Sequence, residues 1–156
     1  MTAYTRKTVP GQTYLYIEET TDTEPDSMAR EMRRAFTEIT AFMQEKGITP
    51  SGPALSLYPS FEMAPMTFRS GFFVSEEDAA LASDPVKSGT TPEGEVVTMT
   101  HTGPYIALAA TYKTLMEALQ HDGLTYVTPT WEVYLNDPAE TAPDDLQTEI
   151  FVTIAS

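Results

Sequence analysis

Hydrophobic and polar residues follow two different periods in the first fifty residues of the chain. Over residues 12–20, QTYLYIEET, leucine and isoleucine alternate with tyrosine and glutamate, and this period of two predicts a half-buried strand. Over residues 26–46 the apolar positions recur every three or four residues, which predicts an amphipathic helix. Asp26 or Ser27 is suited to cap this helix and Gly47 to end it.

The same order of elements then occurs a second time. Strand patterns at 53–59 and 66–74 complete the first set, and a connection rich in Ser, Pro, Gly and acidic residues follows. The second set consists of a strand at 95–101, a helix that starts at Gly103-Pro104 and ends near Gly123, and strands at 130–136 and 146–155. The predicted apolar stripe of this helix contains Ile106, Leu108, Ala109, Tyr112, Leu115, Met116 and Leu119.

An internal repeat relates the two sets. Gly47 and Pro53 lie 76 residues before Gly123 and Pro129, and the same offset places PALSLY on PTWEVY. We therefore expect one domain over residues 1–156 that contains a duplicated strand–helix–strand–strand unit. Its parts are module 1 at about 10–75, a linker at about 76–93 and module 2 at about 94–155.

The alternation within each strand predicts which side chains share a face of the sheet. The helices need an apolar surface to cover, so we expect them to lie on the aliphatic side of each strand. That side contains Leu15, Ile17, Leu55, Leu57, Phe72, Val74, Trp131, Val133, Leu135, Ile150, Val152 and Ile154. The opposite side contains Tyr14, Tyr16, Tyr58, Phe73, Met99, His101, Glu132, Tyr134 and Phe151. A concave aromatic surface suits a flat or cationic organic ligand, although a dimer would bury it equally well.

Glu132 is the exception in a strand that is otherwise typical of a sheet. The repeat places it on Ser56, so the scaffold does not require a carboxylate at this position. The side chain would be solvated, paired with Arg69, or used to meet a cationic ligand. We expect a single carboxylate in the ligand cleft, whereas His101 is more typical of a strand-end or capping residue than of a catalytic base.

Composition narrows the classes of function. The net charge is −14, which disfavours direct nucleic-acid binding, and the acidic residues are best interpreted as a solvated surface. The sequence has no cysteine and only two histidines, so neither a metal site nor a cofactor is predicted. No apolar run is long enough to span a membrane or to act as a signal peptide, and a cytoplasmic location is the default expectation.

Three segments in order resemble one known family. They are His101-Thr102-Gly103-Pro104-Tyr105, Glu132-Val133-Tyr134-Leu135-Asn136-Asp137-Pro138 and Thr148-Glu149-Ile150. In this order and spacing they resemble the GyrI-like small-molecule-binding domain, the effector-binding domain of AraC- and MerR-type multidrug-responsive regulators, which also occurs alone. The resemblance is strong over residues 94–155 and weaker over 10–75.

The resemblance implies an α+β fold in which two pseudo-symmetric modules form one curved, mainly antiparallel sheet. Both helices would lie on one face and a ligand cleft on the other. In regulators of the family, a strand glutamate at the position of Glu132 meets cationic, lipophilic ligands with tyrosines around it. In standalone members that hydrolyse cyclopropane-containing toxins, the corresponding glutamate is catalytic. A helix-turn-helix domain has no room in this chain, so direct transcriptional control is not expected.

Three functions remain open from the sequence. The first is a standalone protein that senses or sequesters an aromatic or lipophilic small molecule, with a cationic ligand favoured. Its expected ligand-binding residues are Glu132, Tyr134, Tyr14, Tyr16, Tyr58, Phe73, Met99 and Phe151. The second is a hydrolase of a strained or electrophilic toxin, with Glu132 as general acid or base. The third is a gyrase-type protein inhibitor; a homodimer or another protein partner is compatible with each of the three.

Overall fold

The computed structural model describes residues 4–22, 24–60 and 65–155, and these form one open antiparallel sheet of eight strands with three α-helices. The helices are α1 (Pro25–Lys46), α2 (Glu76–Ala79) and α3 (Leu108–His121), with 3-10 turns η1 (Tyr105–Ala107) and η2 (Pro143–Asp145). The strands are β1 (Thr5–Val9), β2 (Thr13–Thr21), β3 (Ala54–Tyr58), β4 (Met66–Phe73), β5 (Lys87–Thr90), β6 (Gly94–Thr102), β7 (Tyr126–Tyr134) and β8 (Gln147–Ile154). The predicted α+β class is confirmed.

The strand order shows the pseudo-symmetry of the sheet. It reads β1-β6-β8-β7-β3-β4-β2-β5, so the sets β6-β8-β7 and β2-β4-β3 meet at the central pair β7 and β3. In that pair Ser56 lies directly opposite Glu132, and these are the two residues that the sequence repeat superposes. A pseudo-twofold axis therefore passes through the Ser56–Glu132 pair. The module boundaries remain a prediction, and residues 1–3, 23, 61–64 and 156 lie outside the described part of the chain.

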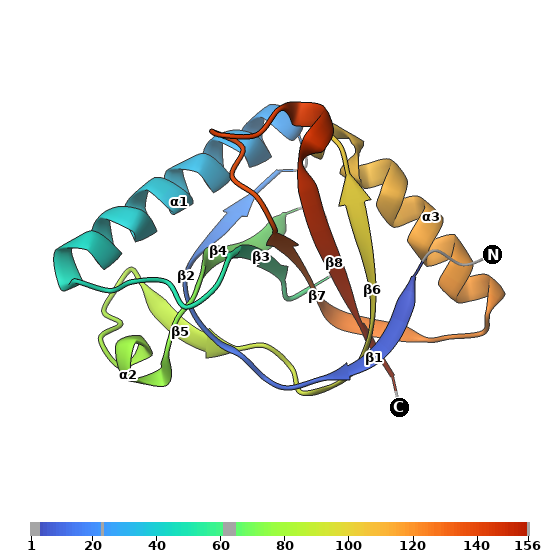
Figure 1. Ribbon diagram of the computed structural model, residues 1–156, viewed down its shortest axis with the longest axis horizontal. Coiled ribbons are helices and arrows are strands. Elements are labelled where there is room, and N and C mark those ends of the chain that lie inside the picture. Colours follow the sequence, from blue (N-terminus) through green and yellow to red (C-terminus); the bar gives the residue numbers. More distant parts are fainter. Residues whose placement is uncertain (1–3, 23, 61–64, 156) are drawn as a thin grey trace.

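The two long helices cover one face of the sheet, one over each half (Figure 1). The predicted apolar stripe of α1 packs on Leu15 and Ile17 of β2, and α3 packs on Val97, Ile150 and Val152 of β6 and β8. Burial of these aliphatic side chains, each worth about 1.5–3 kcal/mol, holds the helices in place.

Two details at the helix ends differ from expectation. Gly47 ends α1 in the left-handed conformation with φ of 71°, as predicted. At the other end the N-cap is Glu24, without a side-chain hydrogen bond, so Asp26 and Ser27 are not the cap. Ile106, expected in the apolar stripe of the second helix, is 88% exposed because residues 105–107 form η1 ahead of α3.

The sheet is curled by two short connections that run between its edges. Residues 10–12 join β1 to β2, and residues 91–93 join β5 to β6. Each connection links strands six positions apart in the sheet, about 29 Å if the sheet were flat, whereas four residue steps span at most about 14 Å. The connections also bind each other, because Gln12 and Thr91 exchange two hydrogen bonds of 2.9 Å (Figure 1). The uncovered face is therefore concave.

This concave face has an apolar core of its own. The core lies between β2, β3, β4, β6 and β7 and contains Tyr14, Tyr16, Leu55, Leu57, Phe73, Val96, Trp131 and Val133. Gly71 of β4 permits the close approach of β2, since a Cβ atom there would lie 1.8 Å from the carbonyl oxygen of Leu15. The sheet is thus buried on both faces, by helices on one and by its own curvature on the other.

Candidate functional site

The sheet separates the eight residues predicted to bind one ligand into two groups. Tyr14, Tyr16, Phe73 and Phe151 lie on the concave face, as expected. Glu132, Tyr134, Tyr58 and Met99 lie on the helix-covered face. The predicted orientation of β3 and β7 is therefore wrong: Leu55, Leu57, Trp131 and Val133 face the concave core, and the polar residues between them face the helices. The orientation of β6 was also predicted wrongly, because Met99 and His101 face α3.

Glu132 lies at the centre of the helix-covered face and is only 4% exposed. Tyr112 of α3 donates a hydrogen bond of 2.8 Å to its Oε2 atom, and Tyr134 of the same strand donates one of 3.0 Å to Oε1. No lysine or arginine of the described residues forms an ion pair with this carboxylate. Arg69, its suggested partner, lies on the concave face and binds Glu18. Glu132 is therefore a buried carboxylate held by phenol groups.

The electrostatics of this cluster follow from its burial. Desolvation raises the pKa of the Glu132 carboxyl, and the hydrogen bonds from Tyr112 and Tyr134, with the nearby His101, counteract only part of that effect. The pKa values of Tyr58, Tyr112 and Tyr134 are raised well above that of free tyrosine, first by desolvation and then by the Glu132 charge. Burial thus favours the protonated form of each phenol, and Tyr112 and Tyr134 stabilise the carboxylate by donating hydrogen bonds to it.

Side chains from α1 and from η1, the turn that precedes α3, cover this cluster. Tyr134 contacts the rings of Phe36 from α1 and Tyr105 from η1, at centroid distances of 6.3 and 5.6 Å. The sulfur of Met32 lies 3.9 Å from the Tyr134 hydroxyl oxygen and 3.8 Å from that of Ser56. Figure 1 shows the N-terminal ends of α1 and α3 approaching each other while their C-terminal ends diverge. Aromatic and thioether side chains therefore fill the space between the helices.

His101 fixes the start of the second helix. Its Nε2 atom lies 3.1 Å from the carbonyl oxygen of Pro104, and its Nδ1 atom lies 2.6 Å from the hydroxyl of Thr111 in α3. A carbonyl can only accept, so Nε2 carries a proton and donates it. The histidine joins the end of β6 to α3, in agreement with its predicted structural role.

Two buried hydroxyl groups on the same face have no hydrogen-bond partner among the described residues. They are Ser70 Oγ on β4 and Thr148 Oγ1 on β8, and both side chains are fully buried. Ser70 lies opposite Ser56, which in turn lies opposite Glu132, so these three polar residues form a line across β4, β3 and β7. Thr148 lies opposite Tyr134 and His101. An unpaired buried hydroxyl costs about 1–3 kcal/mol, so each of the two is a local destabilising feature of the free protein.

The concave face has a different chemistry. The rings of Trp131 and Phe151 stack at 5.0 Å and 3°, and the guanidinium of Arg69 lies 4.5 Å from the ring centre of Tyr16. Charged groups here have partners: Arg69 binds Glu18, and Lys7 lies 3.7 Å from Glu149. This face combines an aromatic core with satisfied ion pairs.

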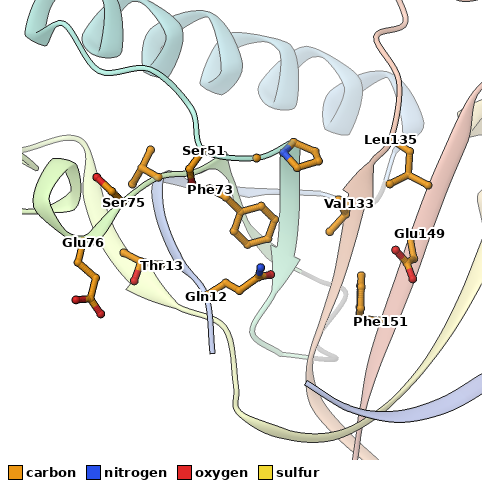
Figure 2. Close-up of a pocket in the computed structure, with 13 residues that line it drawn as sticks. Gln12, Thr13, Ser51, Phe73, Ser75, Glu76, Val133, Leu135, Glu149 and Phe151 are labelled. Carbon is orange, nitrogen blue, oxygen red and sulfur yellow. The ribbon is translucent and has the colours of Figure 1, made fainter. Parts of the chain in front are cut away.

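An open groove of about 580 Å³ lies at one end of the concave face. Figure 2 shows Phe73 and Phe151 along its wall, with Glu76 and Glu149 on opposite sides. Glu132 and the tyrosines around it are not among its lining residues. The groove and the buried carboxylate are therefore separate features on opposite faces of the sheet.

No group of three or more His, Asp or Glu side chains suited to hold a metal ion occurs in residues 4–22, 24–60 and 65–155. Among the same residues, no helix has the length and apolarity needed to cross a membrane.

Comparison with known families decides the assignment. The model of the GyrI-like small molecule binding domain matches residues 2–155. The chain belongs to this family. The resemblance inferred from the sequence is thereby confirmed, and the GyrI-like domain accounts for nearly the whole chain. No curated protein sequence matches it.

Solved structures support the same fold at low sequence identity. The EcmrR C-terminal domain is 18% identical with a TM-score of 0.82, over 98% of this chain and 97% of that one. SAV2435 bound to tetraphenylphosphonium is 12% identical with a TM-score of 0.69, over 98% and 94%. A hydrolase from Listeria innocua is 18% identical with a TM-score of 0.64, over 97% and 91%. These likenesses establish the fold.

The residues that sequence reasoning missed come from the helices. Tyr112 was predicted only as part of the apolar stripe, and Tyr105 only as part of a family motif, whereas both lie beside the Glu132–Tyr134 cluster. The sequence signal for the Tyr112–Glu132 contact is a tyrosine in the otherwise apolar stripe of the second helix.

Proposed function

We propose that this GyrI-like domain binds an organic cation at Glu132, between the centre of the sheet and the N-terminal halves of α1 and α3. The observation that carries the proposal is a carboxylate that is 4% exposed and has tyrosine hydroxyls, but no ion-pair partner among the described residues. The residues proposed to surround the ligand are Glu132, Tyr134, Tyr58 and Tyr112, with Tyr105, Met32 and Met99 next to them.

The chemistry of the cluster favours a lipophilic cation. Burial of a carboxylate without a cationic partner costs free energy, and a cation that reaches it forms an ion pair at low dielectric. Tyrosine rings add cation–π attraction of about 0.5–2 kcal/mol each. The flexible side chain of Met32 can move to admit ligands of different shapes. SAV2435, which shares the fold, binds a cation of this kind, tetraphenylphosphonium.

Calorimetric titration with tetraphenylphosphonium tests the proposal. Glu132→Gln preserves the shape of the side chain and removes its charge, so we expect Kd to rise by about 30-fold or more, or about 2–5 kcal/mol. Glu149→Gln is the matched control, because Glu149 lies on the neighbouring strand but on the concave face. It should change Kd less than about twofold. Equal affinity of wild type and Glu132→Gln would disprove the charge role.

Hydrolysis is the second candidate, and the raised pKa of Glu132 favours it. A carboxyl with a raised pKa beside a tyrosine hydroxyl can act as general acid or base toward a strained electrophile. A hydrolase is also among the proteins that share the fold. Turnover of a cyclopropane-containing electrophile that disappears in Glu132→Gln would support this function, and undiminished turnover in that variant would exclude Glu132 as its catalyst. The cytoplasmic location, the homodimer and the protein partner stay predictions.

A further inference from the structure

The helix-covered face presents a carboxylate and serine hydroxyls, whereas a purely lipophilic cation could interact only with the carboxylate. Ser70, Ser56 and Glu132 lie directly opposite one another on three neighbouring strands, and all three are at most 4% exposed. Adjacent strands are about 4.8 Å apart, so the line from Ser70 to Glu132 spans about 10 Å. A charged group stands at one end of this line and an unpaired hydroxyl at the other.

We propose that this line of residues selects an aromatic ammonium ligand that also carries a hydroxyl or carbonyl group. The inference rests on the proposed function and adds a second subsite to it. The ammonium N–H groups donate to the Glu132 carboxylate, and the distal oxygen exchanges hydrogen bonds with Ser70 and Ser56. The aromatic part of the ligand lies between them.

The contacts of the serine side chains in the free protein agree with this arrangement. The Ser56 hydroxyl lies 3.8 Å from the sulfur of Met32, a weak acceptor. Ser70 has no partner in the described part of the chain, although a hydroxyl can both donate and accept. A bound oxygen would satisfy Ser70 and replace the sulfur contact of Ser56 with a stronger hydrogen bond. Sites that hydrogen-bond a ligand hydroxyl discriminate strongly against analogues that lack it, because the protein groups are then left unpaired.

A quaternary onium ion would use this line poorly. It has no N–H group to donate to Glu132 and no oxygen for the distal subsite, so it gains only charge attraction and ring contact. The line therefore separates two ligand classes: quaternary onium ions, which engage Glu132 alone, and hydroxylated ammonium ions, which engage both ends.

Three related probes test the inference with the full chain: serotonin, tryptamine and N,N,N-trimethylserotonin. Tryptamine lacks the ring hydroxyl and the trimethyl compound lacks the ammonium N–H groups, while each keeps the indole and the positive charge. By calorimetry we expect serotonin to bind about tenfold more tightly than either analogue. In Ser70→Ala its advantage over tryptamine should disappear, while the affinity for tryptamine itself should not change.

Thr148→Val is the matched control, because it removes an equally buried and unpaired hydroxyl on the same face but outside the line. It should leave all three affinities unchanged. Loss of the serotonin advantage in Thr148→Val but not in Ser70→Ala would overturn the assignment of the subsite. Equal, Glu132-dependent binding of all three probes would overturn the inference and leave the proposed function standing. Absence of any Glu132-dependent binding would overturn both.

Thermal unfolding without ligand gives a second measurement. If Ser70 has no partner in the free protein, Ser70→Ala should leave Tm unchanged or raise it by a few degrees, because an unsatisfied group costs about 1–3 kcal/mol and each kcal/mol shifts Tm by about 2–4 °C in a domain of this size. A fall of several degrees would show that the hydroxyl is already used in folding, which would remove the basis of the subsite.

Discussion

Both faces of the sheet are buried, but they differ in how their polar groups are paired. On the concave face, aromatic rings pack against one another, and Lys7 and Arg69 are each paired with a glutamate. On the helix-covered face, the centre holds a carboxylate and two unpaired hydroxyls under Met and Tyr side chains. One face is therefore a core whose ion pairs are formed, whereas the other buries a carboxylate without a cationic partner and hydroxyls without a hydrogen-bond partner among the described residues.

This difference arises from how each face is closed. The concave face is closed by the curvature that the 10–12 and 91–93 connections impose, so its strands can bury large rings against one another. The other face is closed by two helices whose buried residues lie mainly in their C-terminal halves, such as Ile39 and Met43 in α1 and Leu115 and Leu119 in α3. The N-terminal halves carry partly buried side chains, and the Glu132 cluster lies beneath them. Polar groups are tolerated in that region.

The largest effect on stability should come from the concave core. Trp131 is 3% exposed and stacked on Phe151, so Trp131→Ala should lower the free energy of unfolding by about 3–5 kcal/mol, measured by urea denaturation. Trp131→Phe, which keeps an aromatic stack, should lose much less. If the comparison of the faces is correct, neither variant should alter the affinity for a cation more than a few-fold where it remains folded. A loss of affinity in Trp131→Phe as great as in Glu132→Gln would place the ligand on the concave face.

Hydrogen bonds to the buried carboxylate should have the next largest effect. Tyr112→Phe removes the donor to Glu132 Oε2 and leaves that oxygen buried without a partner. Because bonds to charged groups contribute about 1.5–3 kcal/mol, stability near pH 7 should fall by about that amount. The matched variant Tyr16→Phe removes a tyrosine hydroxyl from the concave core, where the ring packs on Arg69, and should have a smaller effect. Equal losses at pH 7 would show that Tyr112 contributes through packing rather than through the carboxylate.

The sequence predicted the order of the elements within the two modules and their pseudo-symmetry, but not the orientation of β3, β6 and β7. The period of two correctly separated Glu132 and Tyr134 from Trp131 and Val133. It did not show which set faces the helices, because that depends on whether the opposite face is exposed. The strand at 5–9 and the strand at 87–90 were not predicted, and these edge strands anchor the connections that bury the concave face.

Contacts between elements that are distant in the sequence could not be predicted either, because they depend on how the elements pack. Tyr112 and Tyr134 are brought together by the crossing of α3 over β7, which no local pattern encodes. The Ser56–Glu132 pair is different, because two equivalent residues at a pseudo-twofold axis must meet, and the repeat alone indicated their equivalence. Symmetry was therefore a better guide to this site than the polarity of individual strands.

The pH dependence of stability gives a smaller and more specific comparison. Burial raises the pKa of Glu132, so the folded state binds its proton more tightly than the unfolded state does. The wild type should lose stability as pH rises from the ordinary glutamate pKa through the raised one, by on the order of 1.4 kcal/mol for each pH unit that separates these two pKa values. Glu132→Gln should be less stable or equal at low pH and more stable at neutral pH. Parallel stability curves for wild type and variant would show that the carboxyl titrates normally.

The smallest effect is expected at the rim of the concave face. Arg69 is partly exposed, stacks on Tyr16 and lies 3.1 Å from Glu18, and surface pairs of this kind contribute about 0–1 kcal/mol. Arg69→Met keeps much of the packing and removes the charge, so stability should fall by less than about 1 kcal/mol, and the loss should shrink in high salt. Arg69→Lys keeps the charge but not the planar stack and separates the two contributions. Because Glu132 lies on the other face, neither variant should change the pH at which Glu132 titrates. A shift of that pH in Arg69→Met would show that charges on the two faces interact through the sheet. The two faces would then be separate in their packing but not in their electrostatics.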